Sequence, residues 1–212
     1  MHNRHIILCR HGYRDDQDRE LIGNDGLTRY GVMQAKLLGE RLREYGVKQI
    51  VSSPFKRTLI TAETIASVLN VQFTIDPLYS EWLNESWHKQ SPQIETNLEI
   101  CKRYPHAIPI SKIINIHDMF PESYEGMCRR CQKAVDIINS SKESVIIVTH
   151  GSIISQIASI MTKRVSEEFA AEVASLTILT QTMKDKWDVH INSNIDHLNK
   201  YLKVSYLLDK GR

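Results

Sequence analysis

The sequence predicts an α/β protein built around a mostly parallel sheet. Short apolar runs alternate along the chain with longer segments in which apolar residues recur every three or four positions. The first pattern is typical of strands buried on both faces, and the second of amphipathic helices. Their alternation predicts βαβ units, in which helices cover both faces of a parallel sheet.

The strands are predicted from short, mainly apolar runs. Those expected in the parallel part of the sheet are His5–Arg10, Gln49–Ser53, Val71–Ile75 and Ser144–Thr149. Near the C-terminus, two further runs flank a polar turn at 183–186 and predict an antiparallel hairpin at the edge of the sheet. These runs are Ala174–Thr180 and Trp187–Asn192.

Helices are predicted between the strands, and most begin with a capping signal. Thr28 is the expected N-cap of a helix that ends at Gly46. Ser53 followed by Pro54 is typical of an N-cap and first helical residue. A third helix is expected from about Ser123, and a fourth from the spacing of Ile153, Ile154, Ile157, Ala158 and Met161.

Residues 82–120 interrupt this alternation. The segment is long, polar and irregular, which is typical of an inserted cap or lid and not of a core element. We therefore predict a single domain over residues 1–212, with a cap inserted at about 82–120.

Composition excludes several classes of protein. The chain has 27 Lys and Arg against 25 Asp and Glu, a formal charge of +2, and charges of both signs are interleaved. Nucleic-acid binders usually carry a clustered basic surplus. The apolar runs are shorter than a membrane span of ~20 residues, and the first is too short for a signal peptide. We expect a cytoplasmic protein with neither a nucleic-acid nor a membrane partner.

The pair Cys128 and Cys131 has the C-x-x-C spacing of zinc and redox sites. No second Cys or His pair accompanies it, and the surrounding pattern is helical, so that both residues share one face. We interpret them as buried helical cysteines.

The dipeptide Arg-His lies on both sides of the first apolar run, as Arg4-His5 and as Arg10-His11. Ligands of open α/β sheets bind beyond the carboxyl ends of the strands. Arg4-His5 enters the strand at its amino end, and we interpret it as surface. Arg10-His11 leaves the strand at its carboxyl end and is the candidate reactive pair.

Further polar residues are expected at the same edge. Arg57 lies in the first turn of the helix after the second strand, and His150 follows a later strand. Guanidinium groups, imidazoles and helix N-termini together describe a phosphate site. Gly12 and Gly151, which follow the histidines, are expected to allow unusual backbone angles and close approach of a ligand. Arginines would repel a divalent cation, so we expect no metal and no cofactor.

Segments along nearly the whole chain, in the same order, resemble those of the histidine phosphatase superfamily. These phosphoglycerate-mutase-like proteins include, in their branch 1, phosphatases and mutases. The matching segments are ILCRHGYR, LTRYGVMQAKLLGERL, IVSSPFKRTLITAETIA, DPLYSEW and VIIVTHGSI. The resemblance implies a phosphoglycerate-mutase-like, three-layer α/β/α fold.

The resemblance also implies a role for each candidate residue. His11 would be the nucleophile and would form a phosphohistidine intermediate. Arg10, Arg57 and His150 would hold the phosphoryl group and stabilise the charge on its oxygens. Arg14 would bind phosphate as well.

The general acid of the family is a Glu on the loop after the third strand, where this chain offers Glu81 and Glu85. Glu81 fits the family position, and we favour it. Its role would be to protonate the leaving oxygen and then to activate water.

The residues after Arg-His-Gly bear on the type of reaction. Glycolytic mutases have Glu-Ser or Glu-Thr there and an Asn further on, whereas this chain has Tyr13-Arg14, and Gln17 at the position of the Asn. Arg-His-Gly-x-Arg resembles phosphatase members. We therefore predict a metal-independent phosphatase that hydrolyses phosphomonoesters. The alternatives are a phosphoglycerate mutase-type phosphotransferase and a weakly active scaffold that binds a phospho-ligand.

The substrate is left open between a small phosphorylated molecule and a phosphopeptide. Trp82, Trp87 and Tyr79 could flank an aromatic leaving group or could pack the cap. Cations of the cap could recognise a second anionic group or form a solvated surface. These cations are Lys89, Lys102, Arg103, His106 and Lys112. The sequence also leaves a homodimer open.

Overall fold

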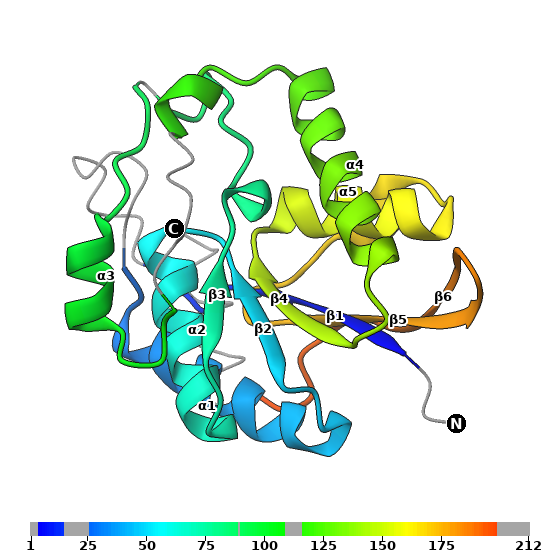
Figure 1. Cartoon of the computed structure of the whole chain (residues 1–212), viewed down its shortest axis with the longest axis horizontal. Helices are drawn as coiled ribbons and strands as arrows, with labels where there is room; N and C mark the ends of the chain where they lie inside the picture. The colour runs from blue at the N-terminus through cyan, green and yellow to red at the C-terminus, as the bar shows by residue number, and fades with distance from the viewer. Residues whose placement is uncertain (1–3, 15–25, 89, 109–115, 199–212) are drawn as a thin grey trace, which may run out of the picture.

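The protein forms an α/β/α sandwich around one six-stranded sheet with the strand order β3-β2-β4-β1-β5-β6 (Figure 1). The computed structural model describes residues 4–14, 26–88, 90–108 and 116–198. Strands β1 to β4 are parallel, β5 is antiparallel to β1, and β6 is antiparallel to β5. The strands are β1 (His5–Arg10), β2 (Gln49–Ser52), β3 (Phe73–Ile75), β4 (Val145–Thr149), β5 (Leu176–Met183) and β6 (Lys186–Asn194). The predicted fold class, including the antiparallel edge, is confirmed.

Helices cover both faces of the sheet. On one face lie α1 and α2, with α3 beside them, and on the other lie α4 and α5 (Figure 1). The helices are α1 (Arg29–Leu42), α2 (Lys56–Leu69), α3 (Asn97–Arg103), α4 (Tyr124–Ser140) and α5 (Gly151–Thr162). Short 3₁₀ turns are η1 (Arg43–Tyr45), η2 (Pro77–Tyr79), η3 (Ile116–Met119) and η4 (Ser166–Phe169).

The apolar run of β1 is continuous because the strand is buried on both faces. Ile7 and Cys9 are buried in the core beneath α1 and α2, whereas Ile6 and Leu8 are buried in the core beneath α4 and α5. Successive side chains of a strand point to opposite faces, so a central strand needs apolar residues at every position. Burial of each large apolar side chain contributes about 1.5–3 kcal/mol.

The predicted cap at Thr28 is confirmed, the predicted cap at Ser53 is wrong, and the helix expected from about Ser123 has Ser123 as its N-cap. The Thr28 hydroxyl accepts a hydrogen bond from the Gly31 amide, and Ser123 caps α4 in the same way. Helix α2 begins instead at Lys56 after Phe55, which makes no side-chain cap. Ser53 does not cap this helix because its hydroxyl is hydrogen bonded to His150.

The segment 82–120 contains more regular structure than its composition predicts. Helix α3 begins with a capping box, in which Thr96 and Glu99 satisfy each other's backbone amides. After this helix, Ala107 forms a parallel bridge with Phe73 of β3. The segment is therefore attached to the β3 edge of the sheet.

On α4, Cys131 is buried and Cys128 is half-buried, close to the predicted arrangement. Over the described residues, no set of three or more His, Cys, Asp or Glu side chains could hold a metal ion. No helix in the described ranges is long and apolar enough to cross a membrane.

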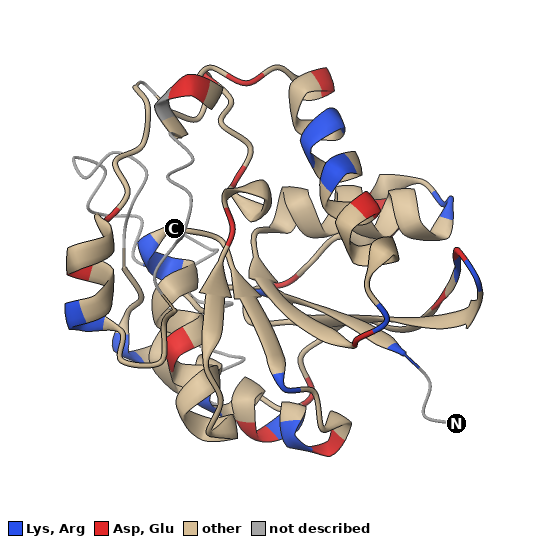
Figure 2. Cartoon of the chain, viewed as in Figure 1, with Lys and Arg blue, Asp and Glu red and all other residues tan. Residues whose placement is uncertain are grey.

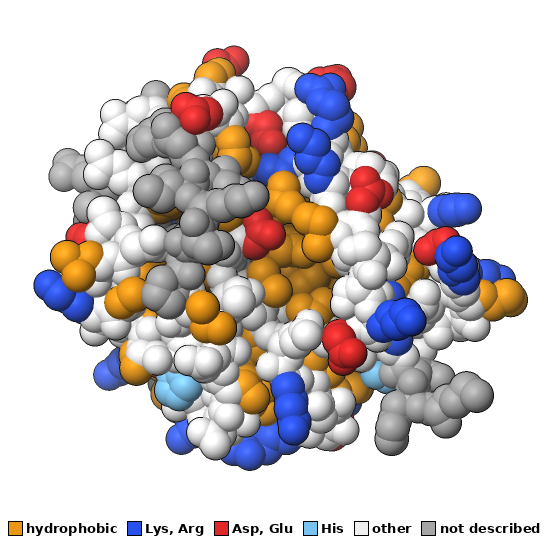
Figure 3. Space-filling model, in the orientation of Figure 1, with side chains coloured by type: hydrophobic (Ala, Val, Ile, Leu, Met, Phe, Trp, Pro, Cys, Tyr) orange, Lys and Arg blue, Asp and Glu red, His pale blue; other side chains and the backbone are white. Residues whose placement is uncertain are grey.

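Lys and Arg are interspersed with Asp and Glu along the helices and loops of the chain (Figure 2). Figure 3 shows hydrophobic side chains in a hollow over β2 and β4, beside α4. Val51 and Val145, which belong to these strands, are only partly buried and pack against the core on that face.

Candidate active site

Adjacent strands bring the two histidines together. Because β1 pairs with β4, Arg10 lies opposite Thr149, and the His11 amide donates to the Thr149 carbonyl at 3.1 Å. The His11 and His150 rings lie edge to face with 5.4 Å between their centroids. Both histidines therefore lie at the carboxyl edge of the sheet, as the sequence predicts.

The His11 ring has a defined orientation. Its Nδ1 lies 2.8 Å from the Gly12 carbonyl, which can only accept, so Nδ1 carries the proton and Nε2 carries the lone pair. The ring is 4% exposed. Burial, followed by the positive charges of Arg57 and Arg10, holds the pKa of His11 well below its usual value. The ring is therefore neutral, and its Nε2 is a potential nucleophile.

The His150 ring is fully buried, with a hydrogen-bond partner at each nitrogen. Its Nε2 lies 2.8 Å from the Ser53 hydroxyl, and Arg57 Nη2 lies 3.2 Å from its Nδ1. Phe55 packs edge to face against it at 5.1 Å. Burial, followed by the charges of Arg57 and the nearby His11 and Arg10, lowers the pKa of His150 well below its usual value.

The arginines approach from three segments. Arg57 is 2% exposed, and its guanidinium lies 4.7 Å from the Phe55 ring centroid. Arg10 donates from Nη1 to the Ala171 carbonyl at 2.7 Å, while its buried Nε has no hydrogen-bond partner in the described part of the chain. A buried N–H without a partner is costly, which is consistent with a site preorganised for an anion. Arg14 is close enough for its charge to lower the pKa of His11.

The Glu81 carboxylate completes the cluster. Its Oε2 lies 3.4 Å from His150 Nδ1 and 3.6 Å from Arg57 Nη2. Its Oε1 accepts hydrogen bonds from the Ser152 hydroxyl at 2.5 Å and from the Trp82 amide at 3.1 Å. Glu85, the alternative acid, is exposed to solvent. The geometry thus brings Glu81, and not Glu85, to the histidines.

A buried ion pair that the sequence reading missed supports the loop that carries Glu81. Arg130 of α4 donates to the backbone carbonyls of Leu78, Ser80 and Glu81 at 2.8, 2.8 and 3.2 Å. It also forms a bidentate pair with Glu122, with distances of 2.7 and 2.8 Å. Arg130 occupies the apolar face of a helical pattern, which was the signal that could have identified it.

Ser53 and Ser152 were also missed as site residues. Ser53 follows β2 and Ser152 lies in the first turn of α5, so each reaches the edge predicted to bind the ligand. A hydroxyl directly beyond a strand end was the available signal for both.

The unusual backbone angles expected of the two glycines are not found, whereas close approach of a ligand stays a prediction. Neither Gly12 nor Gly151 has a positive φ angle. A Cβ atom on Gly12 would lie 2.4 Å from the Gly31 carbonyl oxygen, and one on Gly31 would lie 2.1 Å from the Tyr13 carbonyl oxygen. Gly12 and Gly31 are thus required by the close packing of the His11 loop on the start of α1.

Several residues for which the sequence left a binding role open have structural contacts. Arg103 pairs with Glu95, and His106 lies 2.5 Å from a Glu63 carboxylate oxygen. Tyr79 is 4% exposed and packs in the core beneath α4 and α5. Gln17, Lys89 and Lys112 lie outside the described residues. Trp82 and Trp87 pack edge to face at 5.2 Å, and Trp87 is exposed.

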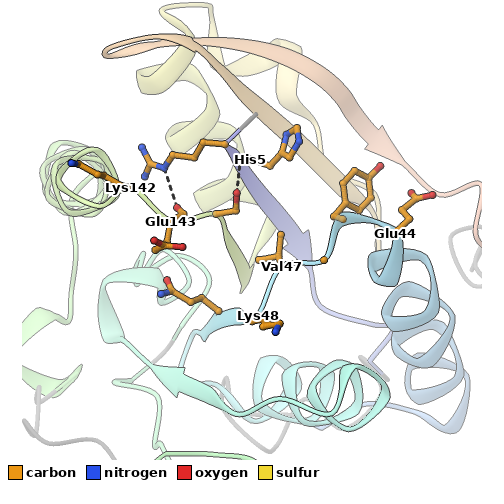
Figure 4. Close-up of a pocket in the computed structure, with 11 residues that line it drawn as sticks. His5, Glu44, Val47, Lys48, Lys142 and Glu143 are labelled. Carbon is orange, nitrogen blue, oxygen red and sulfur yellow. Dashed lines mark hydrogen bonds between the residues drawn. The ribbon is translucent and has the colours of Figure 1, made fainter. Parts of the chain in front are cut away.

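At the opposite edge of the sheet, Arg4 and His5 are half-buried, which differs from the surface position expected. They line a pocket together with residues of the segments before β2 and β4 (Figure 4). Arg4 Nε donates to the Glu143 carbonyl, and the His5 amide donates to the Ser144 hydroxyl (Figure 4). The pocket is not lined by any of the residues gathered at the carboxyl edge, namely Arg10, His11, Arg57, Glu81 and His150.

The family model of the histidine phosphatase superfamily (branch 1) matches residues 6–194. The chain belongs to this superfamily. The match begins in β1 and ends in β6, so it includes every strand of the sheet.

Curated relatives of the chain include a human ubiquitin-associated and SH3 domain-containing protein B, 29% identical over 143 residues. That match covers 59% of this chain and 21% of the human protein. A probable phosphatase of Schizosaccharomyces pombe is 27% identical over 158 residues, which cover 70% of this chain and 69% of the relative. The chain thus spans about a fifth of the first relative and about two thirds of the second.

Solved structures share the fold. The ecdysone phosphate phosphatase of Bombix mori, in complex with tungstate, superposes with a TM-score of 0.71 at 19% identity, covering 93% of this chain and 95% of that one. A mycobacterial glucosyl-3-phosphoglycerate phosphatase superposes with a TM-score of 0.65 at 20% identity, covering 90% and 98%. These likenesses establish a phosphoglycerate-mutase-like fold.

Proposed function

We propose that this histidine phosphatase is a metal-independent enzyme that hydrolyses phosphomonoesters through a phosphohistidine intermediate on His11, with Glu81 as general acid and base. The observation that carries the proposal is the hydrogen bond from His11 Nδ1 to the Gly12 carbonyl. This bond leaves the lone pair on Nε2 of a ring that lies beside His150 and close to the charges of Arg57 and Arg10. A neutral imidazole so held is already in the form that attacks phosphorus.

In the first step, His11 Nε2 attacks phosphorus, and an N–P bond forms as the P–O ester bond breaks. Glu81 gives its proton to the leaving oxygen, which departs as a neutral alcohol. In the second step, Glu81 takes a proton from water as the water oxygen attacks phosphorus. The N–P bond breaks, inorganic phosphate leaves, and His11 and Glu81 return to their starting states.

The arginines and His150 stabilise charge in both steps. Arg10, Arg14 and Arg57 are assigned to the phosphoryl oxygens, where their forked donors match the geometry of the group. His150 donates Nε2–H to Ser53 and accepts from Arg57, which positions the guanidinium. Because these groups are held by the fold before substrate binds, little reorganisation is needed in the transition state.

Hydrolysis is favoured over phosphotransfer by Tyr13-Arg14 after Arg-His-Gly and by relatives named as phosphatases. The names of the relatives refer to ecdysone phosphate and glucosyl-3-phosphoglycerate, and these suggest monoesters of alcohols as the first substrates to assay.

The test is phosphate release combined with trapping of the intermediate. Wild-type protein in the presence of a chelator is mixed with a ³²P-labelled monoester and quenched under alkaline conditions within the first turnover. Trypsin cleaves after Arg4, Arg10 and Arg14, so a label on His5 and a label on His11 fall in different peptides. We expect the label on the peptide 11–14.

Several outcomes would change the proposal. Release of phosphate with a label elsewhere, or with none, would remove His11 as the nucleophile. Transfer of the label to a phosphoglycerate faster than phosphate release would favour the mutase alternative. A stable label without turnover would favour the scaffold.

A further inference from the structure

Gln34 is a buried polar residue of α1 with no role in the mechanism above. It lies on the inward face of the helix with Gly31 and Leu38, and only 1% of it is exposed. Its Oε1 accepts a hydrogen bond from the Tyr13 amide at 2.9 Å. A buried side-chain amide is costly unless it is hydrogen bonded, and this bond connects Gln34 to the loop that follows His11.

The hydrogen bond from Tyr13 fixes the plane of one peptide group. The Tyr13 N–H and the Gly12 carbonyl belong to the same planar group, so an acceptor on the N–H also fixes the direction of the carbonyl. The Gly12 carbonyl oxygen lies 2.8 Å from His11 Nδ1 and accepts the hydrogen bond that leaves the lone pair on Nε2. Through this peptide, Gln34 therefore orients the group that sets the tautomer of His11.

Thr61 of α2 holds the preceding peptide in the same way. Thr61 is fully buried, and its hydroxyl accepts a hydrogen bond from the Gly12 amide at 3.1 Å. The same hydroxyl donates to the Arg57 carbonyl at 2.8 Å. The Gly12 N–H belongs to the peptide between His11 and Gly12. Both peptides that flank Gly12 are therefore held by side chains, one from each of the two helices on this face of the sheet.

The peptide between Gly12 and Tyr13 depends on this restraint. Gly12 is required by its close packing on Gly31, yet a glycine restricts rotation of the following peptide less than any other residue does. The Tyr13 carbonyl accepts a hydrogen bond from the Thr28 amide at 3.0 Å, but it belongs to the next peptide and does not fix the Gly12 carbonyl. An acceptor from α1 is therefore needed to keep the Gly12 carbonyl in place.

We propose, on the basis of the function proposed above, that Gln34 and Thr61 are positioning residues for the nucleophile, which hold the Gly12 carbonyl where it accepts from His11 Nδ1. Both act through Gly12 and not through the phosphoryl group. Without them the carbonyl turns away, and the imidazole proton is shared between Nδ1 and Nε2. A ring with its proton on Nε2 has no lone pair there to attack phosphorus, so kcat falls while KM changes little.

The first measurement is the tautomer of His11, which needs no turnover. Protein with ¹⁵N-labelled imidazole rings is studied by NMR, and comparison with His11→Ala identifies the His11 signals among those of the 9 histidines. Wild-type protein should show a pyrrole-like Nδ1 and a pyridine-like Nε2. Gln34→Met keeps the length of the side chain but removes the acceptor, and in this variant both nitrogens should move toward intermediate shifts.

The second measurement is steady-state hydrolysis of p-nitrophenyl phosphate. Gln34→Met should lower kcat by roughly 5- to 150-fold, the effect expected when one buried group loses its partner. Gln34→Glu keeps an acceptor oxygen at the same place and should restore part of kcat and of the wild-type tautomer. Leu38→Ala is the control, because it leaves a cavity in the core beneath α1 and removes no hydrogen bond. It should lower the stability but change neither the tautomer nor kcat.

Thr61→Val has nearly the same shape as the wild-type residue and keeps the proposal testable if Gln34→Met does not fold. It should shift the His11 nitrogens and kcat in the same direction, whereas Thr61→Ser, which keeps the hydroxyl, should not. Unchanged nitrogen signals in Gln34→Met and Thr61→Val, or equal changes in Leu38→Ala, would overturn the positioning role. Shifted signals in a protein that hydrolyses no ester and forms no phosphohistidine would support that role and refute the proposed function instead.

Discussion

The two Arg-His pairs at the ends of β1 have the same sequence but different environments. At the amino end, Arg4 donates to the carbonyls of Glu143 and Ile138 and to the Gln181 side chain, and it stacks over Trp187 at 4.9 Å. At the carboxyl end, Arg10 donates from Nη1 to one carbonyl and retains a buried Nε without a partner in the described chain.

The histidines differ in the same sense. His5 is half-buried at the mouth of a pocket of about 690 Å³, and its Nδ1 lies 3.0 Å from the Thr180 hydroxyl (Figure 4). His11 is almost fully buried among arginines. The helix ends differ as well, because α2 and α5 begin at the carboxyl edge, whereas α4 ends at the amino edge, where Arg4 binds the Ile138 carbonyl. The side chains of the amino-end pair are therefore hydrogen bonded within the protein. The carboxyl-end pair lies near helix N-termini, where an anionic ligand is favoured.

The largest expected effect separates these two histidines. His11→Ala removes the nucleophile and should lower kcat for p-nitrophenyl phosphate by about 10⁴-fold or more. His5→Ala should keep kcat within a factor of about two, because His5 contacts no residue of the site. Steady-state phosphate release measures both. Comparable losses in the two variants would remove the distinction between the ends of β1.

The next effect separates two glutamates. Glu81→Gln cannot protonate the leaving oxygen and should lower kcat/KM for an alkyl phosphate by roughly 10²- to 10⁴-fold. The loss should be smaller for p-nitrophenyl phosphate, whose leaving group needs less protonation. Glu85→Gln is the matched control, because Glu85 is exposed. An equal loss with both esters would show that Glu81 is not the acid.

The buried pair of Arg130 and Glu122 is expected to position the Glu81 loop. Arg130→Met leaves the Glu122 carboxylate buried and unpaired and should lower the free energy of unfolding by about 3–5 kcal/mol in chemical denaturation. The double variant Arg130→Met/Glu122→Leu should regain most of this stability. Both should retain a loss of roughly ten- to a hundredfold with alkyl phosphates, because the loop carbonyls lose their donor.

Arg129→Met is the control for this change, since Arg129 is the exposed neighbour on α4. A double variant that recovers full activity together with stability would limit Arg130 to a structural role.

The smallest effect is on the pH dependence of stability. The pKa of His11 is lowered mainly by burial, so between that pKa and the ordinary value of about 6.5 the unfolded chain binds a proton that the folded chain does not. The free energy of unfolding should therefore fall as pH drops from 7 to 5, by at most about 1.4 kcal/mol per pH unit for each such histidine.

The two ends of β1 can be compared in this way too. The pKa of His5 is lowered mainly by burial and further by His190, but His5 is only half-buried. Denaturation between pH 5 and 7 should show that His11→Asn flattens the pH dependence more than His5→Asn does. A larger flattening with His5→Asn would contradict the difference in burial.

Much of the fold is encoded in local patterns. The predicted bounds of β1 are those observed, because an apolar run that is buried on both faces has abrupt polar ends. The cap at Thr28 and the start of α4 at about Ser123 depend only on nearby residues, and they too could be predicted. The position of Arg10-His11 at the ligand edge follows from the direction of the strand alone.

What only the tertiary structure decided is which distant residues meet. The order β2-β4-β1 brings Ser53 to His150, so a residue that resembles a helix cap becomes a hydrogen-bond partner in the site. Arg130 binds the Glu81 loop, and Gly12 packs on Gly31, across gaps in sequence that no local pattern spans. The reactive residues of the site can thus be predicted from short segments of sequence. Its supporting contacts arise from strand order and helix packing, because these minimise the free energy of the whole chain and not of any one segment.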